Sequence, residues 1–327
     1  MINHLCKHIE TRMRQIGNRR VAPLAILAAV LMGGPTNAST GEFKVAYLYN
    51  LSDFTGTIPY SLAKIALDAT ARETYVISGE TVKVFNNSGM EVYRFTNTME
   101  SGIVYDAAID EQGRILVLAY NNGTPSLLLC NYRAEPIKPI EFKGLPEKLA
   151  AFKPNRLMLR DGKICLVSLG SMMIVTLDPE GNYVKHIDLA EASGTSDEDR
   201  LNMGIGAVAF DSDGSILFTT PVIGKVFRIA ADGKVDSFGK RGSAPGKFGV
   251  PTGIAADGLG NYYISDKLRC AILVFDRQFK FIYEFGGRGD APGSLVGPDD
   301  LAIDAEGKLY VGQLGKRGVS VFKVTHD

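Results

Sequence analysis

An internal repeat constrains the fold of this chain more than any other feature of its sequence. Asp257 and Asp304 are 47 residues apart, and Tyr263 and Tyr310 keep the same separation. The linker at residues 238–246 also matches the linker at residues 285–293. A short apolar run with a turn after it occurs four more times, with more drift, towards the N-terminus. The six anchor positions are residues 68, 110, 160, 211, 257 and 304, at steps of 42 to 51 residues.

Each of the six units follows the same plan of short strands. A first apolar strand leads through a Gly-containing turn to a second strand, and a third strand alternates apolar and polar residues, as in residues 82–85. A polar turn then leads to a fourth strand, such as residues 92–95. Short strands divided by Gly, Asn and Asp indicate hairpins, and no segment shows a helical period. Six such units predict an all-β fold, a six-bladed β-propeller.

The last unit is incomplete, because it stops after its third strand, at residues 321–324. A strand-like segment, residues 43–49, precedes the first full unit. We expect this N-terminal strand to supply the missing fourth strand of the last blade, which closes the ring and removes its open sheet edges.

The recurrent Asp and Gly of the first hairpin allow two interpretations. Glycine supplies a positive φ and aspartate binds the turn backbone, so the pair suits a tight turn. Aspartate can also ligate a metal ion. Turn chemistry is favoured, because the pair recurs once per unit, as geometry requires and a single active site does not.

The N-terminus reads as a secretory signal, which we place at residues 1–38. A basic segment ends at Arg20, an apolar run of about 12 residues follows, and small residues lead to Ala38. That run is shorter than the roughly 20 residues of a membrane-spanning helix. We therefore expect an exported protein, periplasmic or extracellular, with the propeller at residues 39–327 and no membrane span after signal removal. A retained anchor helix is the alternative, and Met13 is an alternative start.

The charge balance gives no support to nucleic-acid binding. The whole chain has 36 basic and 36 acidic residues. The first 38 residues hold five basic residues and one acidic residue, so the remainder carries about four more acidic than basic residues. A mildly acidic protein has no bulk attraction for phosphate backbones.

Three cysteines follow the signal segment: Cys130, Cys165 and Cys270. Each lies in an apolar, strand-like run, and their irregular spacing gives neither a disulfide framework nor a Cys-x-x-Cys site. We expect buried free thiols. A Cys130–Cys165 bridge is the alternative.

Residues 251–286 resemble an NHL repeat. They carry Pro-x-Gly-Ile-Ala-x-Asp, Gly-Asn-x-Tyr, Val-Phe-Asp and Phe-Gly, with a Gly-x-x-Pro-Gly linker nearby. The last two units match this motif well and the first three only in strand plan, and the His that usually precedes the third strand is absent. The resemblance implies a ring-shaped binding platform. Related propellers include protein- and RNA-binding modules, secreted bacterial proteins and a metal-dependent lyase.

Few residues support an enzyme. His186 and His326 are the histidines after the signal segment, and we expect both on the surface, so a His-rich zinc site is disfavoured. Propeller lactonases bind a divalent ion with Glu, Asn and Asp of inner loops. Asn155, Asp299 and Asp300 precede inner strands here and are candidate calcium donors. We expect no cofactor apart from such a structural or channel calcium.

Charged loops offer a docking surface. In propellers, the loops that connect successive blades lie on the same face as the loops between second and third strands; we call it the upper face. On this face we expect a basic side and an acidic side, which would orient a charged partner, although ordinary solvated loops are the alternative. The candidate partner-binding residues are Lys240, Arg241, Lys247, Lys267, Arg269, Arg288, Lys316 and Arg317, with Asp197, Glu198 and Asp199 opposite.

The function expected from these observations is a non-enzymatic interaction scaffold outside the cytoplasm. Its partner would be a protein of the cell envelope or the extracellular space, in an envelope or cytochrome-associated electron-transfer assembly. The alternative is a metal-dependent propeller hydrolase or lyase of the lactonase kind.

Overall fold

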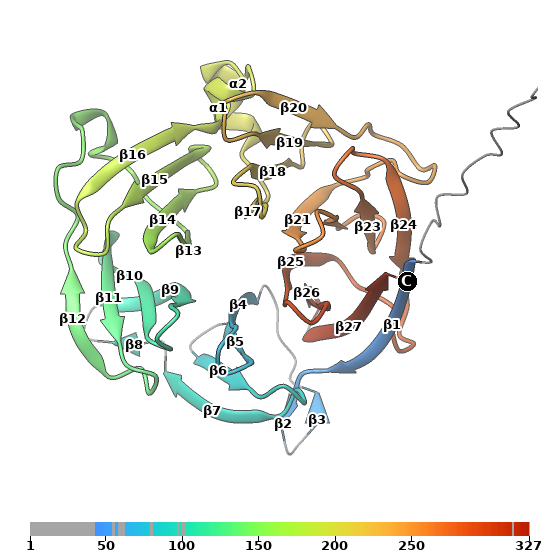
Figure 1. The fold of residues 1–327 in the computed structure, drawn as a ribbon, viewed down its shortest axis with the longest axis horizontal. Coiled ribbons are helices and arrows are strands. Elements are labelled where there is room, and N and C mark those ends of the chain that lie inside the picture. Colours follow the sequence, from blue (N-terminus) through green and yellow to red (C-terminus); the bar gives the residue numbers. More distant parts are fainter. Residues whose placement is uncertain are drawn as a thin grey trace, which may run out of the picture. The chain divides into compact units, whose positions relative to one another are not determined.

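The computed structural model describes residues 43–53, 56–57, 63–78, 81–96, 98–99, 102–315 and 317–326. The expected signal segment and its cleavage position lie outside these residues. Within them the chain forms a ring of six sheets, each with its strands in order from the centre outwards (Figure 1). The predicted six-bladed β-propeller is therefore confirmed.

Blades 1 to 3 occupy the first half of the ring. Blade 1 consists of β4 (Lys64–Asp68), β5 (Glu73–Ser78), β6 (Thr81–Phe85) and β7 (Glu91–Thr96). Blade 2 consists of β9 (Gly102–Ile109), β10 (Ile115–Asn121), β11 (Thr124–Cys130) and β12 (Pro136–Ile140), with β8 (Thr98–Met99) beside β9. Blade 3 consists of β13 (Arg156–Arg160), β14 (Lys163–Ser168), β15 (Met173–Leu177) and β16 (Tyr183–Asp188).

Blades 4 to 6 complete the ring. Blade 4 consists of β17 (Val208–Phe210), β18 (Ile216–Thr220), β19 (Lys225–Ile229) and β20 (Val235–Phe238). Blade 5 consists of β21 (Pro251–Ala256), β22 (Tyr262–Asp266), β23 (Ala271–Phe275) and β24 (Phe281–Gly286). Blade 6 consists of β25 (Pro298–Ile303), β26 (Lys308–Gln313), β27 (Val319–His326) and β1 (Phe43–Asn50). A two-stranded hairpin, β2 (Ser52–Asp53) and β3 (Gly56–Thr57), follows β1.

The outermost strand of blade 6 comes from the other end of the chain, as predicted. β1 pairs antiparallel with β27, from Phe43 opposite His326 to Asn50 opposite Ser320. Its side chains alternate between half-buried and exposed. Strands from both ends of the propeller thus share one sheet, and the ring closes without leaving the edge of β27 unpaired.

The hydrophobic core is divided among the blade interfaces. Six clusters of buried apolar residues lie between neighbouring blades, including one between blade 6 and blade 1 that contains Val321 and Val76. Middle strands are buried on both faces; every residue of β22 and β23 is buried. Burial of apolar side chains between sheets is the main term that holds the blades together.

The recurrent Asp of the first hairpin binds turn backbone in the five units that have it, which confirms the turn interpretation; the third unit has Arg160 at this position. Asp110 Oδ1 accepts from the amides of Gln112 and Arg114 at 2.9 Å, and Asp257 Oδ1 accepts from those of Leu259 and Asn261 at 2.9 and 2.8 Å. The glycine of the turn has a positive φ, +86° at Gly260, which favours glycine there.

Two short helices correct the expectation of a chain without helical segments. α1 (Leu189–Ala192) and α2 (Asp197–Met203) lie between blades 3 and 4, and a 3₁₀ turn, η1 (Glu147–Leu149), lies between blades 2 and 3. Helices of four and seven residues are too short to show an apolar period. Among the described residues there is no helix long and apolar enough to cross a membrane.

Candidate functional site

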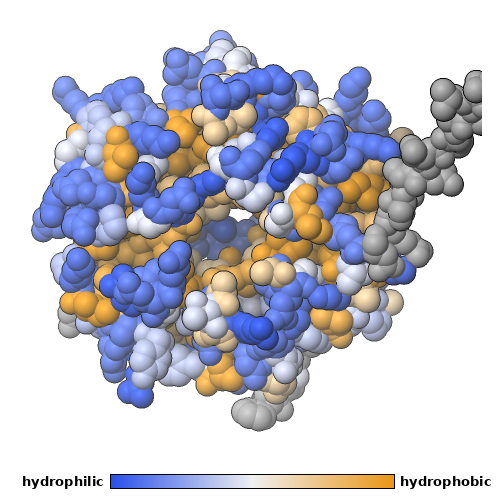
Figure 2. All heavy atoms as spheres, viewed as in Figure 1, coloured by the Kyte–Doolittle hydropathy of each residue, from blue (hydrophilic) through white to orange (hydrophobic). Residues whose placement is uncertain are grey.

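The upper face has two candidate sites, the charged loops predicted from the sequence and a cluster at the mouth of the central channel. Figure 2 shows the opening at the centre of the ring, with hydrophobic residues beside it and hydrophilic residues over much of the surrounding surface. We take the loops first.

The linkers before blades 5 and 6 are pinned to the core. Phe248 and Leu295 are both fully buried, and each pairs as an isolated bridge with the basic residue near the start of its linker, Arg241 or Arg288. Asp266, also fully buried, accepts from the amides of Gly249 and Val250 at 2.6 and 3.0 Å. These loops are therefore held in a defined conformation by contacts beneath them.

Glycine is required where each linker begins. Gly239 has a φ of +94°, and a Cβ there would lie 2.3 Å from the ring of Phe248. Gly286 has a φ of +99°, and a Cβ there would lie 2.8 Å from Leu295. The Phe-Gly pair of the repeat thus allows the buried linker residue to approach the backbone.

Four of the predicted basic docking residues hold the loops together. Arg241 donates to the backbone carbonyls of Pro221 and Val222, and Arg269 forms a forked pair with Glu284, at 2.7 and 2.8 Å from one nitrogen. Lys267 Nζ lies 3.3 Å from Asp299 Oδ1, and Arg317 lies 3.1 Å from Asp290. Arginine suits such forked contacts.

Among the described residues, the side chains of the other predicted basic residues do not hold loops together. Lys240 and Arg288 are exposed, and Lys247 is half-buried. Lys316 lies outside the described residues. Lys240, Lys247 and Arg288 are therefore the cations best able to meet a partner, because their side chains make no hydrogen bond or ion pair with the described residues that would fix a loop.

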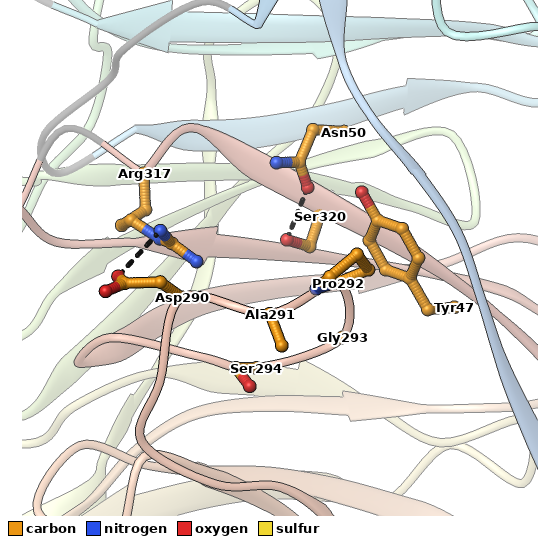
Figure 3. Close-up of a pocket in the computed structure, with 9 residues that line it drawn as sticks. All are labelled: Tyr47, Asn50, Asp290, Ala291, Pro292, Gly293, Ser294, Arg317 and Ser320. Atoms are coloured by element: carbon orange, nitrogen blue, oxygen red, sulfur yellow. Dashed lines mark hydrogen bonds and ion pairs between the residues drawn. The ribbon is translucent and has the colours of Figure 1, made fainter.

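A pocket of about 290 Å³ lies beside Arg317, one of the predicted basic residues, between the linker before blade 6 and β1 (Figure 3). Arg317 and Asp290 pair on one wall, Ser320 donates to Asn50 at 2.6 Å on another, and Tyr47 borders it. Its polar groups mostly satisfy one another, so it offers few free groups to a ligand.

The acidic side of the upper face is the segment that contains α1 and α2. Asp188 caps α1 by accepting from the amides of Ala190 and Glu191, and Ser196 caps α2 by accepting from that of Asp199. Arg200 lies 2.8 Å from Asp188, which ties α2 to β16. Asp197, Glu198 and Asp199 are exposed in the first turn of α2.

Exposed apolar side chains accompany these charges on the upper face. Leu201 of α2 is 88% exposed, and Leu268 in the loop between β22 and β23 is 71% exposed. Val222 and Ile223, in the loop between β18 and β19, are also exposed. Apolar residues that are large, exposed and rimmed by charge are typical of protein interaction surfaces.

The second site, the channel-mouth cluster, consists of Lys64, Asp106, Arg156 and Asp300. Each residue lies on the innermost strand of its blade, four positions before the anchor of its unit, at residues 68, 110, 160 and 304. The corresponding residues of blades 4 and 5 are small, Ala207 and Gly253. The charges of these four residues alternate in sign around the ring. They are negative in blade 6, positive in blade 1, negative in blade 2 and positive in blade 3.

Arg156 spans the channel, because blades 3 and 6 lie opposite each other (Figure 1). Its Nε lies 3.1 Å from Asp106 Oδ2, and its NH1 lies 2.9 Å from Asp300 Oδ1. Burial would lower the pKa of Arg156, but Asp300 and Asp106 outweigh it and raise the pKa above the ordinary value for arginine. The guanidinium is thus charged at every working pH.

Backbone groups complete the channel-mouth cluster. Asp106 Oδ2 accepts from the amide of Leu157 and Asp300 Oδ2 accepts from that of Ile65, both at 2.8 Å. Lys64 Nζ donates to the carbonyls of Tyr105 and Asn155, at 2.7 and 2.6 Å. Burial lowers the pKa of Lys64, with the Asp106 and Asp300 carboxylates opposing that shift. The cluster links blades 1, 2, 3 and 6.

The candidate calcium donors do not converge. Asp300 binds Arg156 and the amide of Ile65, Asp299 faces Lys267, and Asn155 Oδ1 accepts from the amide of Leu169 at 3.0 Å. The described part of the chain contains no group of three or more His, Cys, Asp or Glu placed to hold a metal ion. These residues therefore do not fit a divalent ion of the lactonase kind.

The remaining candidates lie away from the channel. His186 is on the outer strand β16, within 2.7 Å of the Tyr183 hydroxyl, and His326 ends β27, 3.5 Å from Asp257. Cys130, Cys165 and Cys270 are free and buried, as predicted, so the alternative Cys130–Cys165 bridge is absent. Burial raises the pKa of Cys130 to about 11.

Sequence reasoning missed Lys64, Asp106 and Arg156 as members of one site. The signal that could have found them is their shared position in the repeat, four residues before each anchor. Residues at one repeat position lie at one level of a propeller, so a charge pattern at that position predicts a ring of charges around the channel.

Comparisons with known proteins support the fold. No family model matches the chain, and no curated protein matches its sequence. A structure of a streptogramin B lyase is 13% identical, with a TM-score of 0.59, over 86% of this chain and 98% of that one. A protein of unknown function from Bacteroides thetaiotaomicron is 13% identical, with a TM-score of 0.61, over 87% and 76%.

A third similar structure is a gluconolactonase from Xanthomonas campestris. It is 18% identical, with a TM-score of 0.55, over 88% of this chain and 91% of that one. At these identities the likeness shows the fold alone, because one fold carries many functions. The chain is thus similar to both enzymes and proteins of unknown function that share the propeller fold.

Proposed function

We propose that this propeller is a non-enzymatic scaffold that binds a protein partner on its upper face, outside the cytoplasm. The observation that carries the proposal is a rigid face with separated charges. Pinned linkers present Lys240, Lys247 and Arg288 on one side, and α2 presents Asp197 and neighbouring acids on the other.

We expect the exposed apolar residues of this face to supply most of the affinity for the partner. Charges orient an approaching protein, while buried apolar contacts supply most of the affinity. Leu201, Ile223 and Leu268 are exposed beside the charged loops. A partner with an acidic patch, a basic patch and apolar side chains between them would complement this surface, at little conformational cost because the loops are already ordered.

We assign the repeats to the NHL type on the motif at residues 251–286, and we place the protein outside the cytoplasm on the signal-like N-terminus. An envelope or cytochrome-associated assembly is the setting we propose. Neither assignment depends on the identity of the partner.

The test is charge reversal of the three cations that do not fix a loop. The triple variant Lys240→Glu, Lys247→Glu and Arg288→Glu should weaken partner binding about tenfold or more, since reversed charges repel where the native ones attract. Its thermal stability should stay near that of the native protein, because exposed charges contribute little to folding. Arg241 and Arg317 are left unchanged, because they hold loops.

A matched control reverses three exposed lysines elsewhere, Lys138, Lys163 and Lys185, which lie on β12, β14 and β16. The control carries the same change in net charge. Equal binding by native protein and upper-face variant, or equal weakening by the control, would rule the proposal out.

The competing class is a metal-dependent hydrolase or lyase. The structures similar to this chain include a streptogramin B lyase and a gluconolactonase. That class needs oxygen or nitrogen donors that meet in the channel. Here Arg156 lies between the channel carboxylates, which favours the scaffold. Tightly bound stoichiometric metal in the purified protein would favour the enzyme.

A further inference from the structure

We propose that the guanidinium of Arg156 is the resident cation of the channel mouth, in the place that a divalent metal would otherwise take, so that the closed ring needs no metal. This inference concerns the channel and is independent of the docking function of the upper face.

The first argument is geometric. Asp106 of blade 2 and Asp300 of blade 6 both contact the guanidinium of Arg156, at 3.1 and 2.9 Å. Two carboxylates from separate blades therefore point at one small volume, and convergent carboxylates are one element of a calcium site. Arginine fills that volume with a planar cation that donates to both carboxylates.

The second argument concerns the carboxylate oxygens. Asp106 Oδ1 accepts from the amide of Ala107 at 3.1 Å, and its Oδ2 accepts from the amide of Leu157. Asp300 divides its oxygens between the amide of Ile65 and Arg156. Every oxygen of the two side chains has a donor, and Arg156 contacts one oxygen of each, so a metal ion between them would compete with the guanidinium.

The third argument is charge. Lys64 and Arg156 carry two positive charges, and Asp106 and Asp300 carry two negative charges, so the channel-mouth cluster is neutral. A divalent ion added to it would meet two cations at close range, which the low dielectric of the site makes costly. Without Arg156 the remaining cluster is negative, and with a glutamate in its place it carries two net negative charges.

The neighbouring blades make room for this arrangement. Blades 4 and 5 have Ala207 and Gly253 at the level of the cluster, and a Cβ on Gly253 would lie 2.0 Å from the carbonyl of Asp299. At this level blades 4 and 5 have no side chain larger than that of Ala207, and the side chain of Arg156 reaches from blade 3 to Asp300 of blade 6. One residue thus ties opposite blades of the ring together.

The experiment measures the melting temperature of the full chain in excess EDTA and in millimolar calcium chloride. The native protein should melt at the same temperature in both. Arg156→Glu should melt roughly 10 °C lower in EDTA, because three carboxylates then repel, and calcium should recover much of that loss. Arg156→Gln should respond to calcium in the same direction and less strongly. Arg156→Lys, which keeps the charge, should stay insensitive to calcium.

Calorimetric titration with calcium supplies the binding readout. One ion per chain should bind Arg156→Glu, and none should bind the native protein or the variant that carries both Arg156→Glu and Asp300→Asn. If the glutamate variant does not fold, the native and lysine proteins still decide the question. A native melting temperature that falls in EDTA, calcium binding by the native protein, or a folded Arg156→Glu indifferent to calcium would overturn the proposal.

Discussion

Buried tyrosines bind the anchor aspartates of the repeat through their hydroxyl groups and so stabilise the blades. Tyr263 Oη donates to Asp257 Oδ2 at 2.9 Å, and Tyr310 Oη lies 3.4 Å from Asp304 Oδ2 in the next unit. Tyr262 donates across the blade interface to Asp211 at 2.7 Å. The anchor aspartate therefore orders its own turn with one oxygen and holds a buried tyrosine with the other.

These contacts predict a pH dependence. Burial is the main cause that raises the pKa of Tyr262, Tyr263 and Tyr310 above the ordinary value for tyrosine; the neighbouring aspartates add to it, and a hydrogen bond with Thr74 opposes it at Tyr310. The folded protein holds these protons more tightly than the unfolded chain does. Their stabilising contribution is therefore complete below about pH 10 and is lost as the pH rises further.

An absorbance titration of tyrosinate, with circular dichroism on the same samples, checks this expectation. The buried tyrosines should ionise in one steep phase that coincides with alkaline unfolding. Tyr263→Phe should reduce the amplitude of that phase, whereas Tyr132→Phe, at a side chain 62% exposed, should not. Complete ionisation of all tyrosines while the chain remains folded would contradict the account.

At the scale of elements, β1 is the piece on which closure depends. Phe43, Val45 and Tyr47 pack against the cluster between blades 5 and 6, and Ala46 points to solvent. Because neighbouring residues of β1 face opposite sides, the same substitution at Val45 and at Ala46 tests whether β1 packs against the blade interface.

Val45→Asp should lower the free energy of unfolding by about 2–4 kcal/mol, because it places a charge against the blade interface. Ala46→Asp makes the same charge change on the exposed side and should cost less than about 1 kcal/mol. Urea denaturation followed by circular dichroism measures both. Equal losses for the two variants would mean that β1 does not pack as described.

The sequence predicted these elements unequally well. The anchor turns and the missing fourth strand of the last unit follow from local chemistry, because Asp, Gly and strand alternation act within a few residues. The two short helices lack an apolar period, yet Ser196 is an N-cap residue that marks the start of α2. Contacts such as Arg156 with Asp300 join residues far apart in the chain, and only the closed ring brings them together.

The same reasoning explains the docking residues. Loop position was enough to predict that Arg241 lies in the linker before blade 5 and Arg317 in the loop between β26 and β27, but not that they bind loop backbone and Asp290. A charge in a loop can serve a partner or the loop itself, and the difference lies in neighbours that only the fold provides. Among the predicted basic residues, Lys240, Lys247 and Arg288 are therefore the ones to substitute in a test of partner binding.

In the whole ring, the residues that join the blades across the channel differ from those proposed to bind a partner. The channel mouth is a neutral, internally paired layer that joins blades across the ring. The upper face carries exposed charges, such as Lys240 and Arg288, and exposed apolar residues on loops that are fixed from below. Closure and recognition thus use different residues, so each can be changed without the other.

The most direct measurement compares one purified partner, identified by capture on the native protein, across three forms of this chain. Biolayer interferometry gives its affinity for the native protein, for the triple variant at Lys240, Lys247 and Arg288, and for Arg156→Gln at a temperature where circular dichroism shows it folded. The account predicts that the triple variant loses about tenfold or more in affinity and that Arg156→Gln binds like the native protein. Binding that survives the triple variant and is lost in Arg156→Gln would place the functional site in the channel and contradict the account.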